Sequence, residues 1–522
     1  MLYDYLAAHI LSLHLLIPLA GAIVVLALPR KMERAIKITA IASSVCAFGL
    51  TTWLFYAFDT SQNYFQFVEY TVWVPSFNIG YHIGIDGIAL LLVALTTFTM
   101  PIALIYSSDT VKKRVKEYFF FMLILEIGTL GVFLSLDTIL FYIFWEIVLI
   151  PMYFIIGIWG GERRIYATVK FFLFTIVGSL LMLVAILWLG FSQHSFFISD
   201  FEVLQRVGAS LPLNAQMWLF AAFALAFCIK VPVIPFHTWL PDAHTEAPTA
   251  GSVILAGLLL KLGTFGLLRY NLILFPRAAI ELAPFMCILG IAGIIYGALV
   301  SMVQPDMKRV IAYSSVAHLG FVVVGIFSMS AEGMQGAVIQ MVNHGLSTGM
   351  LFLAVGMIYE RRHTRLISEY GGIARVMPRF AVMFALAMLA SVGLPGLNGF
   401  VGEVLILIGT FKSAILHSWV YASVAAMGVI FAAVYLLGLY KRIFFGPLTN
   451  EKNKDLKDLN FRETALLGSI VVFIVWIGFY PSTFLNMSAP TTSAISNYLE
   501  HVPTTDRPAP VKADSTKKVA VR

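Results

Sequence analysis

The stretch KVPVIPFHTWLPDAHTEAPTAGSVILAGLLLKLG, residues 230–263, places two lysines inside long apolar runs near the middle of the chain. Two apolar windows, 217–240 and 249–273, overlap the two ends of this stretch. Each is long enough to cross a bilayer as a helix, which takes about 20 residues. Pro232 and Pro235 follow Lys230 directly, and proline cannot continue the helical hydrogen-bond ladder. The stretch therefore predicts two membrane helices, the first of them broken, with buried charges.

The whole chain is strongly apolar, like its centre. Of 522 residues, 59% are hydrophobic and only 12% are charged, whereas soluble domains carry about 25% charged residues. This composition excludes a water-soluble enzyme and a disordered chain. No Lys or Arg precedes the first apolar run, so we expect a retained span there rather than a cleaved signal peptide.

Apolar windows of membrane-spanning length recur along the sequence. They are continuous rather than alternating, which favours helices over the strands of a membrane barrel. We predict an all-α polytopic membrane protein with about fourteen spans: 10–29, 36–58, 87–107, 118–135, 138–158, 168–190, 217–240, 249–273, 282–302, 309–328, 335–358, 380–411, 420–440 and 463–480.

The basic residues indicate the orientation of these spans. Twenty-three of the 35 Lys and Arg residues follow odd-numbered spans, and only eight lie in the segments on the opposite side. Positive residues concentrate on the cytoplasmic side of membrane proteins, so both termini are predicted on the other side, the periplasmic side in a bacterium. The net charge of +7 is then a topology signal, and we expect no nucleic-acid partner.

Seven of the ionisable residues inside the predicted spans are candidates for function. A charge at the bilayer centre costs about 2.5–3.5 kcal/mol, and such residues commonly form proton relays. The alternative is that they only hold helices together through hydrogen bonds. The set consists of Glu126, Glu146, Lys230, Lys261, His318, His344 and Glu403.

A second break resembles the one after Lys230. Gly393-Leu-Pro-Gly-Leu-Asn-Gly (393–399) interrupts the span 380–411 just before Glu403, and broken helices in two halves mark ion sites in transporters. Spans 4–8 and 9–13 contain five helices each, and this odd number inverts the second unit. We therefore predict two inverted five-helix repeats, with Lys230 and Glu403 at equivalent positions. The corresponding segments are 1–117, 118–273 (first half-channel), 282–440 (second half-channel), 441–480 and a polar, flexible tail at 481–522.

Polar residues accompany the two central histidines at helical spacing. Gln340, Ser347 and Thr348 share a face with His344, and Ser314 and Ser315 share one with His318. Such stripes suit a chain of water molecules. Our hypothesis is that Glu146 modulates Lys230, while Lys261 passes a proton through His318 and His344 towards Glu403.

The remaining metal-binding residue types are interpreted as structural. His82, His237 and His244 lie near predicted helix ends, and no carboxylate or thiol accompanies them at ligand spacing, so no metal site is predicted. Cys46, Cys228 and Cys287 form no paired motif, which excludes an iron–sulfur or zinc cage built by this chain alone. We interpret them as small buried hydrophobic residues.

Several long motifs carry a resemblance to a known family. Residues 230–263, together with QPDMKRVIAYSSVAHLGF (304–321) and GLPGLNGFVGE (393–403), closely resemble the antiporter-like proton-translocating subunits of respiratory complex I. YHIGIDGIALLL (81–92) and FYIFWEIVLIPMYFIIGIWGGERR (141–164) strengthen the resemblance. Clear motifs extend over about residues 80–480.

The resemblance implies a function and a set of partners. It implies a proton-translocating subunit of NADH:quinone oxidoreductase, with Glu146, Lys230, Lys261 and Glu403 at the key positions and Glu126, His318 and His344 in support. FMN, iron–sulfur clusters and the quinone site are then expected on other subunits, and this chain binds no cofactor. The expected partners are the other membrane-arm subunits, including sister antiporter-like subunits, and the lipid bilayer of a bacterial inner membrane, in preference to that of a mitochondrion.

Two other functions stay open at this point. The chain could be a cation/proton antiporter subunit of the Mrp type without a redox partner, although that family usually carries Lys near position 403. It could also be a passive membrane scaffold, which the buried charges disfavour.

Overall fold

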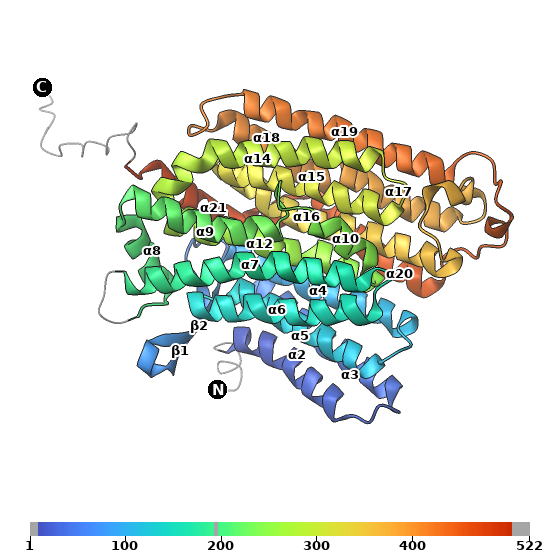
Figure 1. Cartoon of the computed structure of the whole chain (residues 1–522), viewed down its shortest axis with the longest axis horizontal. Helices are drawn as coiled ribbons and strands as arrows, with labels where there is room; N and C mark the ends of the chain where they lie inside the picture. Colours follow the sequence, from blue (N-terminus) through green and yellow to red (C-terminus); the bar gives the residue numbers. More distant parts are fainter. Residues whose placement is uncertain (1–8, 193–196, 504–522) are drawn as a thin grey trace, which may run out of the picture.

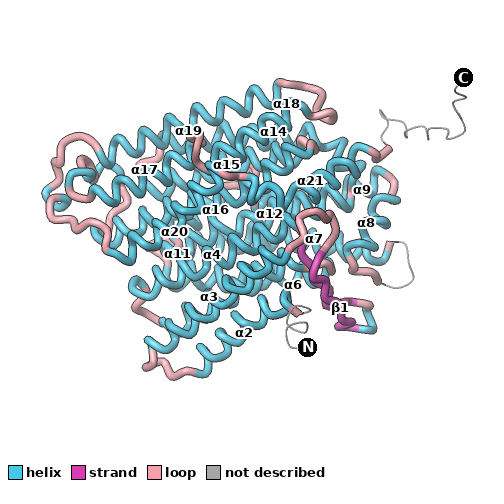
Figure 2. The backbone as a smooth tube through the Cα atoms, turned by 180° about the vertical axis from the view of Figure 1, so that it is seen from behind, coloured by secondary structure: helices cyan, strands magenta, loops and turns pink. Residues whose placement is uncertain are grey.

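The computed structural model describes residues 9–192 and 197–503, and most of them are helical (Figures 1 and 2). Thirteen helical segments in this part of the chain are long and apolar enough to cross a membrane. They confirm the predicted all-α polytopic class. The segments are α2 (Ile10–Ala27), α3 (Glu33–Ala57), α4 (Gly87–Thr110), α5 (Val115–Leu134), α6 (Thr138–Trp159), α7 (Arg164–Phe191), α9 (Leu213–Lys230), the segment Thr249–Leu274, α14 (Pro276–Met302), α15 (Met307–Phe327), α16 (Ala331–Arg362), α19 (Val420–Phe444) and α20 (Phe461–Phe479).

The segment Thr249–Leu274 is not a uniform α-helix. Two π-helical turns, η2 (Leu255–Leu259) and η3 (Leu267–Asn271), separate α11 (Thr249–Ile254), α12 (Leu260–Gly266) and α13 (Leu272–Leu274). Such turns are rare and occur often at functional sites. Lys261 lies in the short α-helix between them.

Both predicted helix breaks are present. After α9 the chain turns through residues 231–238 before α10 (Trp239–Glu246), and α17 (Pro378–Val392) is separated from α18 (Asn398–Lys412) by residues 393–397. The pair α17 and α18 occupies the predicted twelfth span. Lys230 is the last residue before its break, however, whereas Glu403 lies in the helix that follows its break. The two residues thus hold different places relative to the breaks, and the inverted repeat stays a prediction.

One end of the molecule carries elements that the apolar windows did not predict. Strands β1 (Gln66–Val74) and β2 (Ile79–Ile85) pair antiparallel, with the 3₁₀ turn η1 (Pro75–Phe77) between them, and the short helix α8 (Phe201–Ser210) lies at the same end (Figure 1). We call this the β end. The hairpin fills the 59–86 loop, which has no Lys or Arg.

The segment after residue 481 corrects the sequence prediction of a flexible tail. Ser482–Glu500 forms helix α21, which packs at the β end against α4 and α16. Phe484, Ile495 and Leu499 are buried, and Ser496 donates a hydrogen bond to the Met329 carbonyl at 2.9 Å. Tertiary packing on two helix ends thus stabilises a segment whose mixed composition predicts no helix. The predicted tail beyond residue 503 lies outside the described residues.

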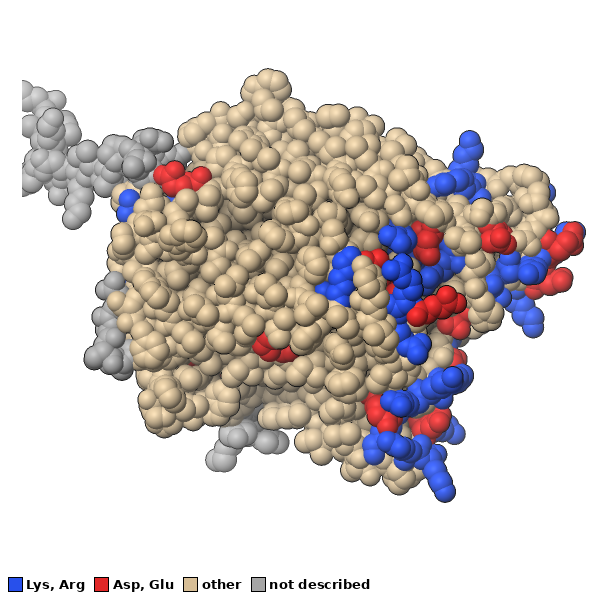
Figure 3. Space-filling model, in the orientation of Figure 1, with Lys and Arg blue, Asp and Glu red and all other residues tan. Residues whose placement is uncertain are grey.

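The opposite end carries most of the charge. Lys and Arg side chains gather there in Figure 3, around the loops that follow α2, α4, α6, α14, α16 and α19. We call this the basic end. Three further 3₁₀ turns lie in its loops: η4 (Ile367–Glu369), η5 (Ile373–Arg375) and η6 (Glu451–Asn453). The asymmetry agrees with the distribution read from the sequence.

Helices differ strongly in how much of their surface is buried. The most apolar windows of α16 and Thr249–Leu274 are completely buried, and that of α15 nearly so, whereas only a third of the residues in the corresponding windows of α3 and α20 is buried. The centre is therefore built by helices that carry ionisable residues. Cys228 and Cys287 are buried as predicted, but Cys46 is exposed on α3, so that part of the interpretation was wrong.

An ion pair at the β end leads to a pH prediction. His82 Nδ1 of β2 lies 2.7 Å from Asp200 Oδ2, and the Val203 amide donates to Asp200 Oδ1 at 3.0 Å. Burial opposes ionisation, but these bonds outweigh it and hold the pKa of Asp200 below its usual value. The resulting stabilisation is present above the unfolded pKa of about 3.9 and is lost as the pH falls through the lower folded pKa.

Asp200→Asn keeps the N-terminal cap of α8 but removes its charge. We expect amide exchange in α8 to be about two- to fivefold faster in this variant at neutral pH, because a charge at a helix N-terminus is worth about 0.3–1 kcal/mol. The difference from the wild type should shrink as the pH of the exchange measurement is lowered below the unfolded pKa of about 3.9 and through the lower folded pKa. Arg206→Gln, which removes an exposed charge from the middle of α8, is the control, because the effect of the helix dipole is confined to the first and last turns. Equal protection in all three proteins at neutral pH would contradict the role of the pair.

Candidate functional site

Lys261 lies at the centre of the molecule with no exposed surface. Its ammonium group donates to the Ala256 carbonyl, in the π-helical turn η2, and to His344 Nδ1 of α16 at 2.7 Å. An isolated buried charge would be very costly, and these acceptors lower that cost. The π-helical turn thus helps to place a cationic side chain beside a histidine of another helix.

The next residues connect α16 with α15 and α18. The rings of His344 and His318 have their centroids 6.0 Å apart. His318 Nδ1 lies 3.2 Å from Glu403 Oε1, and Gln340 donates to the same oxygen at 3.3 Å. Four of the predicted residues therefore form a continuous row across four helices, in the order Lys261, His344, His318 and Glu403. We call this row the central axis.

Glycines make room for the Glu403 end of the axis. Gly393, with φ +83°, ends α17 in the left-handed region, and a Cβ there would lie 2.8 Å from Glu403 Oε2. A Cβ on Gly402 would lie 2.3 Å from Gln340 Oε1. At Gly393 the positive φ disfavours any other residue, and at Gly402 a Cβ would also lie 2.9 Å from the Cβ of Gln340, so a side chain at either position would displace its neighbours. The break motif therefore serves two purposes, to end one helix and to let two others approach closely.

Lys230 and Glu146 form a second group beside the axis. Lys230 Nζ lies over the Trp145 ring, 4.9 Å from its centroid, in a cation–π contact. Glu146 is the carboxylate whose charge acts on Lys230, but the two do not approach within the 4 Å of an ion pair. Lys230 is buried, while Glu146 on α6 is half-buried with one oxygen lacking a hydrogen-bond partner. The structure therefore places the predicted pair in adjacent helices in a separated state.

Glu126 is the predicted residue that lies apart from the others. It is fully buried on α5 and accepts a hydrogen bond from Ser44 of α3 at 2.9 Å, while its second oxygen has no partner. Its bond is thus to the N-terminal helices rather than to any of the other six residues.

Several polar residues near the axis were missed by sequence reasoning. Tyr435 of α19 places its hydroxyl 3.4 Å from His318 Nε2. His244 of α10, which we interpreted as structural, is fully buried and stacked on Phe352, with both ring nitrogens unpartnered. Arg269 was also missed, although a charged residue inside the predicted span 249–273 was an available signal. It pairs with Asp86 at 2.5 Å, and both side chains are buried.

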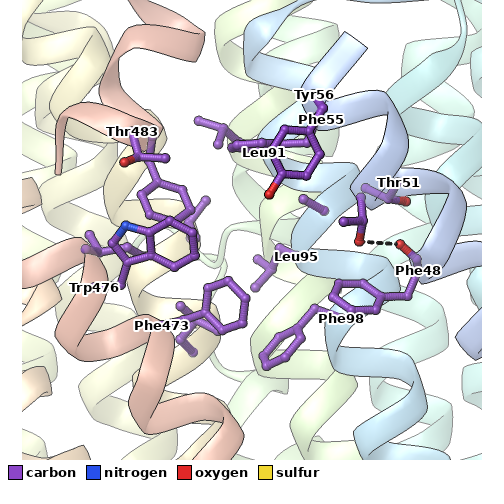
Figure 4. Close-up of a pocket in the computed structure, with 16 residues that line it drawn as sticks. Phe48, Thr51, Phe55, Tyr56, Leu91, Leu95, Phe98, Phe473, Trp476 and Thr483 are labelled. Carbon is purple, nitrogen blue, oxygen red and sulfur yellow. Dashed lines mark hydrogen bonds between the residues drawn. The ribbon is translucent and has the colours of Figure 1, made fainter. Parts of the chain in front are cut away.

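Two cavities differ in their relation to the axis. A polar cavity of about 760 Å³ opens at the basic end, and Lys308, Glu360 and Thr249 are among its lining residues. An apolar pocket of about 250 Å³ lies between α3, α4, α20 and α21, where Phe98, Phe473 and Trp476 face one another (Figure 4). The apolar pocket is lined by no Lys, Arg, His, Asp or Glu. It is therefore not part of the ionisable site.

Comparisons with known proteins identify the family of this chain. Residues 135–428 match the family described as NADH:quinone oxidoreductase/Mrp antiporter, TM. NADH-quinone oxidoreductase subunit M of Rickettsia prowazekii (strain Madrid E) is 44% identical over 92% of this chain and 96% of its own length.

Solved structures give the same result. Respiratory complex I from Thermus thermophilus with bound NADH contains a chain that is 30% identical, with a TM-score of 0.83 over 94% of this chain and 99% of that one. A chain of the Mrp complex from Dietzia sp. DQ12-45-1b has a TM-score of 0.78 at 22% identity, covering 94% of this chain and 55% of that one, and shares the fold alone. The chain therefore belongs to the NADH:quinone oxidoreductase/Mrp antiporter transmembrane family, as a membrane subunit of the respiratory complex I type.

Proposed function

We propose that this chain moves protons across the membrane along the central axis, driven by redox chemistry in other subunits of an NADH:quinone oxidoreductase. The observation that carries the proposal is the row from Lys261 through His344 and His318 to Glu403. Each member can bind and release a proton, and intramembrane rows of this kind are typical of proton relays. A scaffold would not need four titratable groups in succession at the cost of burying them.

Lys230 and Glu146 supply the control in this proposal. Glu146 stabilises the protonated form of Lys230 when the two approach, whereas a separated, buried lysine is less costly in its neutral form. Moving Glu146 towards or away from Lys230 therefore loads or releases a proton. Because Glu146 is half-buried on α6, a neighbouring subunit can bring a charge close to it. Coupled groups of this kind titrate as a set.

The same proposal covers orientation and cofactors. Positive residues face the cytoplasm in membrane proteins, so the basic end is the cytoplasmic end and both termini are periplasmic.

In a relative, subunit M forms part of NADH-quinone oxidoreductase. FMN, the iron–sulfur clusters and quinone are assigned to other subunits, and Glu126 is assigned a supporting role. The two five-helix halves act as inverted half-channels.

Purification and transport assays test the function. We expect the tagged chain to co-purify with flavin- and iron–sulfur-containing subunits, and we expect NADH oxidation by the purified complex in vesicles to acidify the lumen. The chain expressed alone should show no sodium/proton exchange in a dye assay, because no redox partner drives it. Robust sodium/proton exchange by the isolated chain would establish the antiporter function instead.

A further inference from the structure

Buried aromatic rings form a layer on the β-end side of Lys230 and Lys261. Phe141 of α6 contacts Tyr270, with ring centroids 4.2 Å apart, and Phe227 of α9 contacts both of them at 6.3 and 6.4 Å. All three side chains are fully buried. The layer continues to the β end through Phe201 of α8, which contacts Tyr270 at 5.4 Å. It thus joins α6, α9 and the segment Thr249–Leu274.

The packing of this layer leaves little space between the helices. A Cβ on Gly266 would lie 2.4 Å from the Phe227 ring, so α9 and α12 approach as closely as a glycine allows. Phe265, which is 1% exposed, fills the next position and contacts Phe133 of α5 at 5.3 Å. Such close packing of rings excludes chains of water molecules.

A buried ion pair lies within the layer. The Arg269 guanidinium is 4.9 Å from the Phe65 ring centroid and 5.3 Å from that of Phe265, and it bonds to Asp86 at 2.5 Å. Arg269 is eight residues beyond Lys261, about 12 Å nearer the β end at 1.5 Å per residue. The Asp86 carboxylate balances the charge of Arg269, which stays protonated in proteins, and both Asp86 oxygens already accept hydrogen bonds, from the Ala89 amide and from Arg269. The pair therefore fills the gap between the rings and offers no free acceptor for a proton.

The basic-end side of the same lysines is different. The polar cavity of about 760 Å³ reaches Thr249 and Lys308 there. Lys308 is buried and donates to the Ala247 carbonyl at 2.7 Å and to Ser252 at 3.2 Å. Polar groups and open volume therefore lie on one side of the lysines, and rings with a guanidinium lie on the other.

We propose that Phe141, Phe227, Phe265 and Tyr270, with Arg269 held by Asp86, form a seal that stops protons at Lys230 and Lys261 from reaching the β end. The inference rests on the proposed function, because it assumes that these lysines carry protons. The seal makes the first half of the protein accessible from the basic end only. Protons then leave the lysines sideways, through His344.

Passive proton leak tests the seal without depending on driven pumping. The whole complex is reconstituted into liposomes, a pH step is imposed with potassium and valinomycin, and its decay is followed by pyranine without NADH. Asp86→Asn/Arg269→Met removes the pair while it keeps the volume and the α4 cap. We expect the decay of the pH step to be about tenfold faster, because uncharged Asn and Met no longer hold each other between the rings and water can enter the gap, whereas NADH:quinone turnover persists.

Controls distinguish the seal from general damage. Arg361→Met/Glu463→Gln removes an ion pair of 2.7 Å at the basic end and should not leak. Phe141→Ala should leak, while Phe384→Ala, a buried ring of α17 outside the layer, should not. Wild-type decay in assembled Asp86→Asn/Arg269→Met and Phe141→Ala complexes would overturn the seal. Loss of turnover without leak would likewise overturn it. Normal pumping by Lys230→Ala beside leaking seal variants would instead refute the proposed function alone.

Discussion

Replacing Lys230 by alanine is expected to lower NADH-driven proton pumping and quinone-reductase activity about tenfold or more, with the complex still assembled. A positioned proton donor or acceptor contributes about 10²–10⁴-fold to a transfer step, and coupling transmits the loss to electron transfer. Lys230 is buried against Trp145 at the end of α9, and the charge of Glu146 acts on it. Alanine removes the titratable group and leaves the helix break in place.

A second substitution separates proton release from structure. Lys230→Arg keeps the positive charge and the cation–π contact but cannot release its proton, because the guanidinium remains charged. We expect it to be as inactive as Lys230→Ala, whereas a purely structural role predicts rescue by arginine. Lys412→Ala, which removes an exposed lysine paired with Glu332, is the control. Normal pumping by Lys230→Ala and Glu146→Gln in assembled complexes would show that this pair is not the switch.

The second large effect is expected at the other end of the axis. Glu403→Gln preserves side-chain size and can still bond with Gln340 and His318, which now lie 3.3 and 3.2 Å from Glu403 Oε1. It cannot bind or release a proton, so we expect pumping to fall about tenfold. Glu403→Asp keeps the carboxyl group and should recover part of the activity. The measurement is lumen acidification in vesicles that contain matched amounts of assembled complex.

The control for this prediction is the same Glu→Gln substitution at an exposed position. Glu332→Gln neutralises an exposed carboxylate in the first turn of α16 and should pump normally. If Glu403→Gln also pumps normally, protons do not pass through Glu403, and the axis ends at the histidines. If Glu403→Asp is no better than Glu403→Gln, the carboxyl group must stand at one fixed distance from His318.

The sequence predicted the spans because membrane helices need long, uninterrupted apolar runs, and the breaks because proline and glycine cannot sustain a helix. It also predicted the titratable residues, because a charged residue inside a membrane span is costly and is usually retained for a function. Its hypothesis of a path from Lys261 through His318 and then His344 reverses the order of the two histidines that the contacts give. That order depends on α15 and α16 lying between the segment Thr249–Leu274 and α18, and helix neighbours are not encoded in composition.

Other features were missed because they are stabilised by packing against distant elements of the same chain. Helix α21 has few apolar residues and forms on the ends of α4 and α16. The hairpin β1–β2 has register shifts at two places, which disturb the alternation that identifies strands. Tyr435 carries no charge, so nothing in its apolar run distinguishes it before its hydroxyl meets His318.

The direction of the central axis has an electrical consequence. Lys261 lies near the middle of the segment Thr249–Leu274, and His344, His318 and Glu403 lie in the interiors of α16, α15 and α18. The axis therefore crosses these helices and runs roughly parallel to the membrane plane. A proton that moves from Lys261 to Glu403 stays at nearly constant depth and does little work against the membrane potential. The electrical work, about 2.3 kcal/mol per 100 mV for each charge, falls on the steps that bring the proton to Lys261 and carry it away from Glu403. The membrane voltage therefore acts on uptake and release, while transfer along the axis is nearly independent of it.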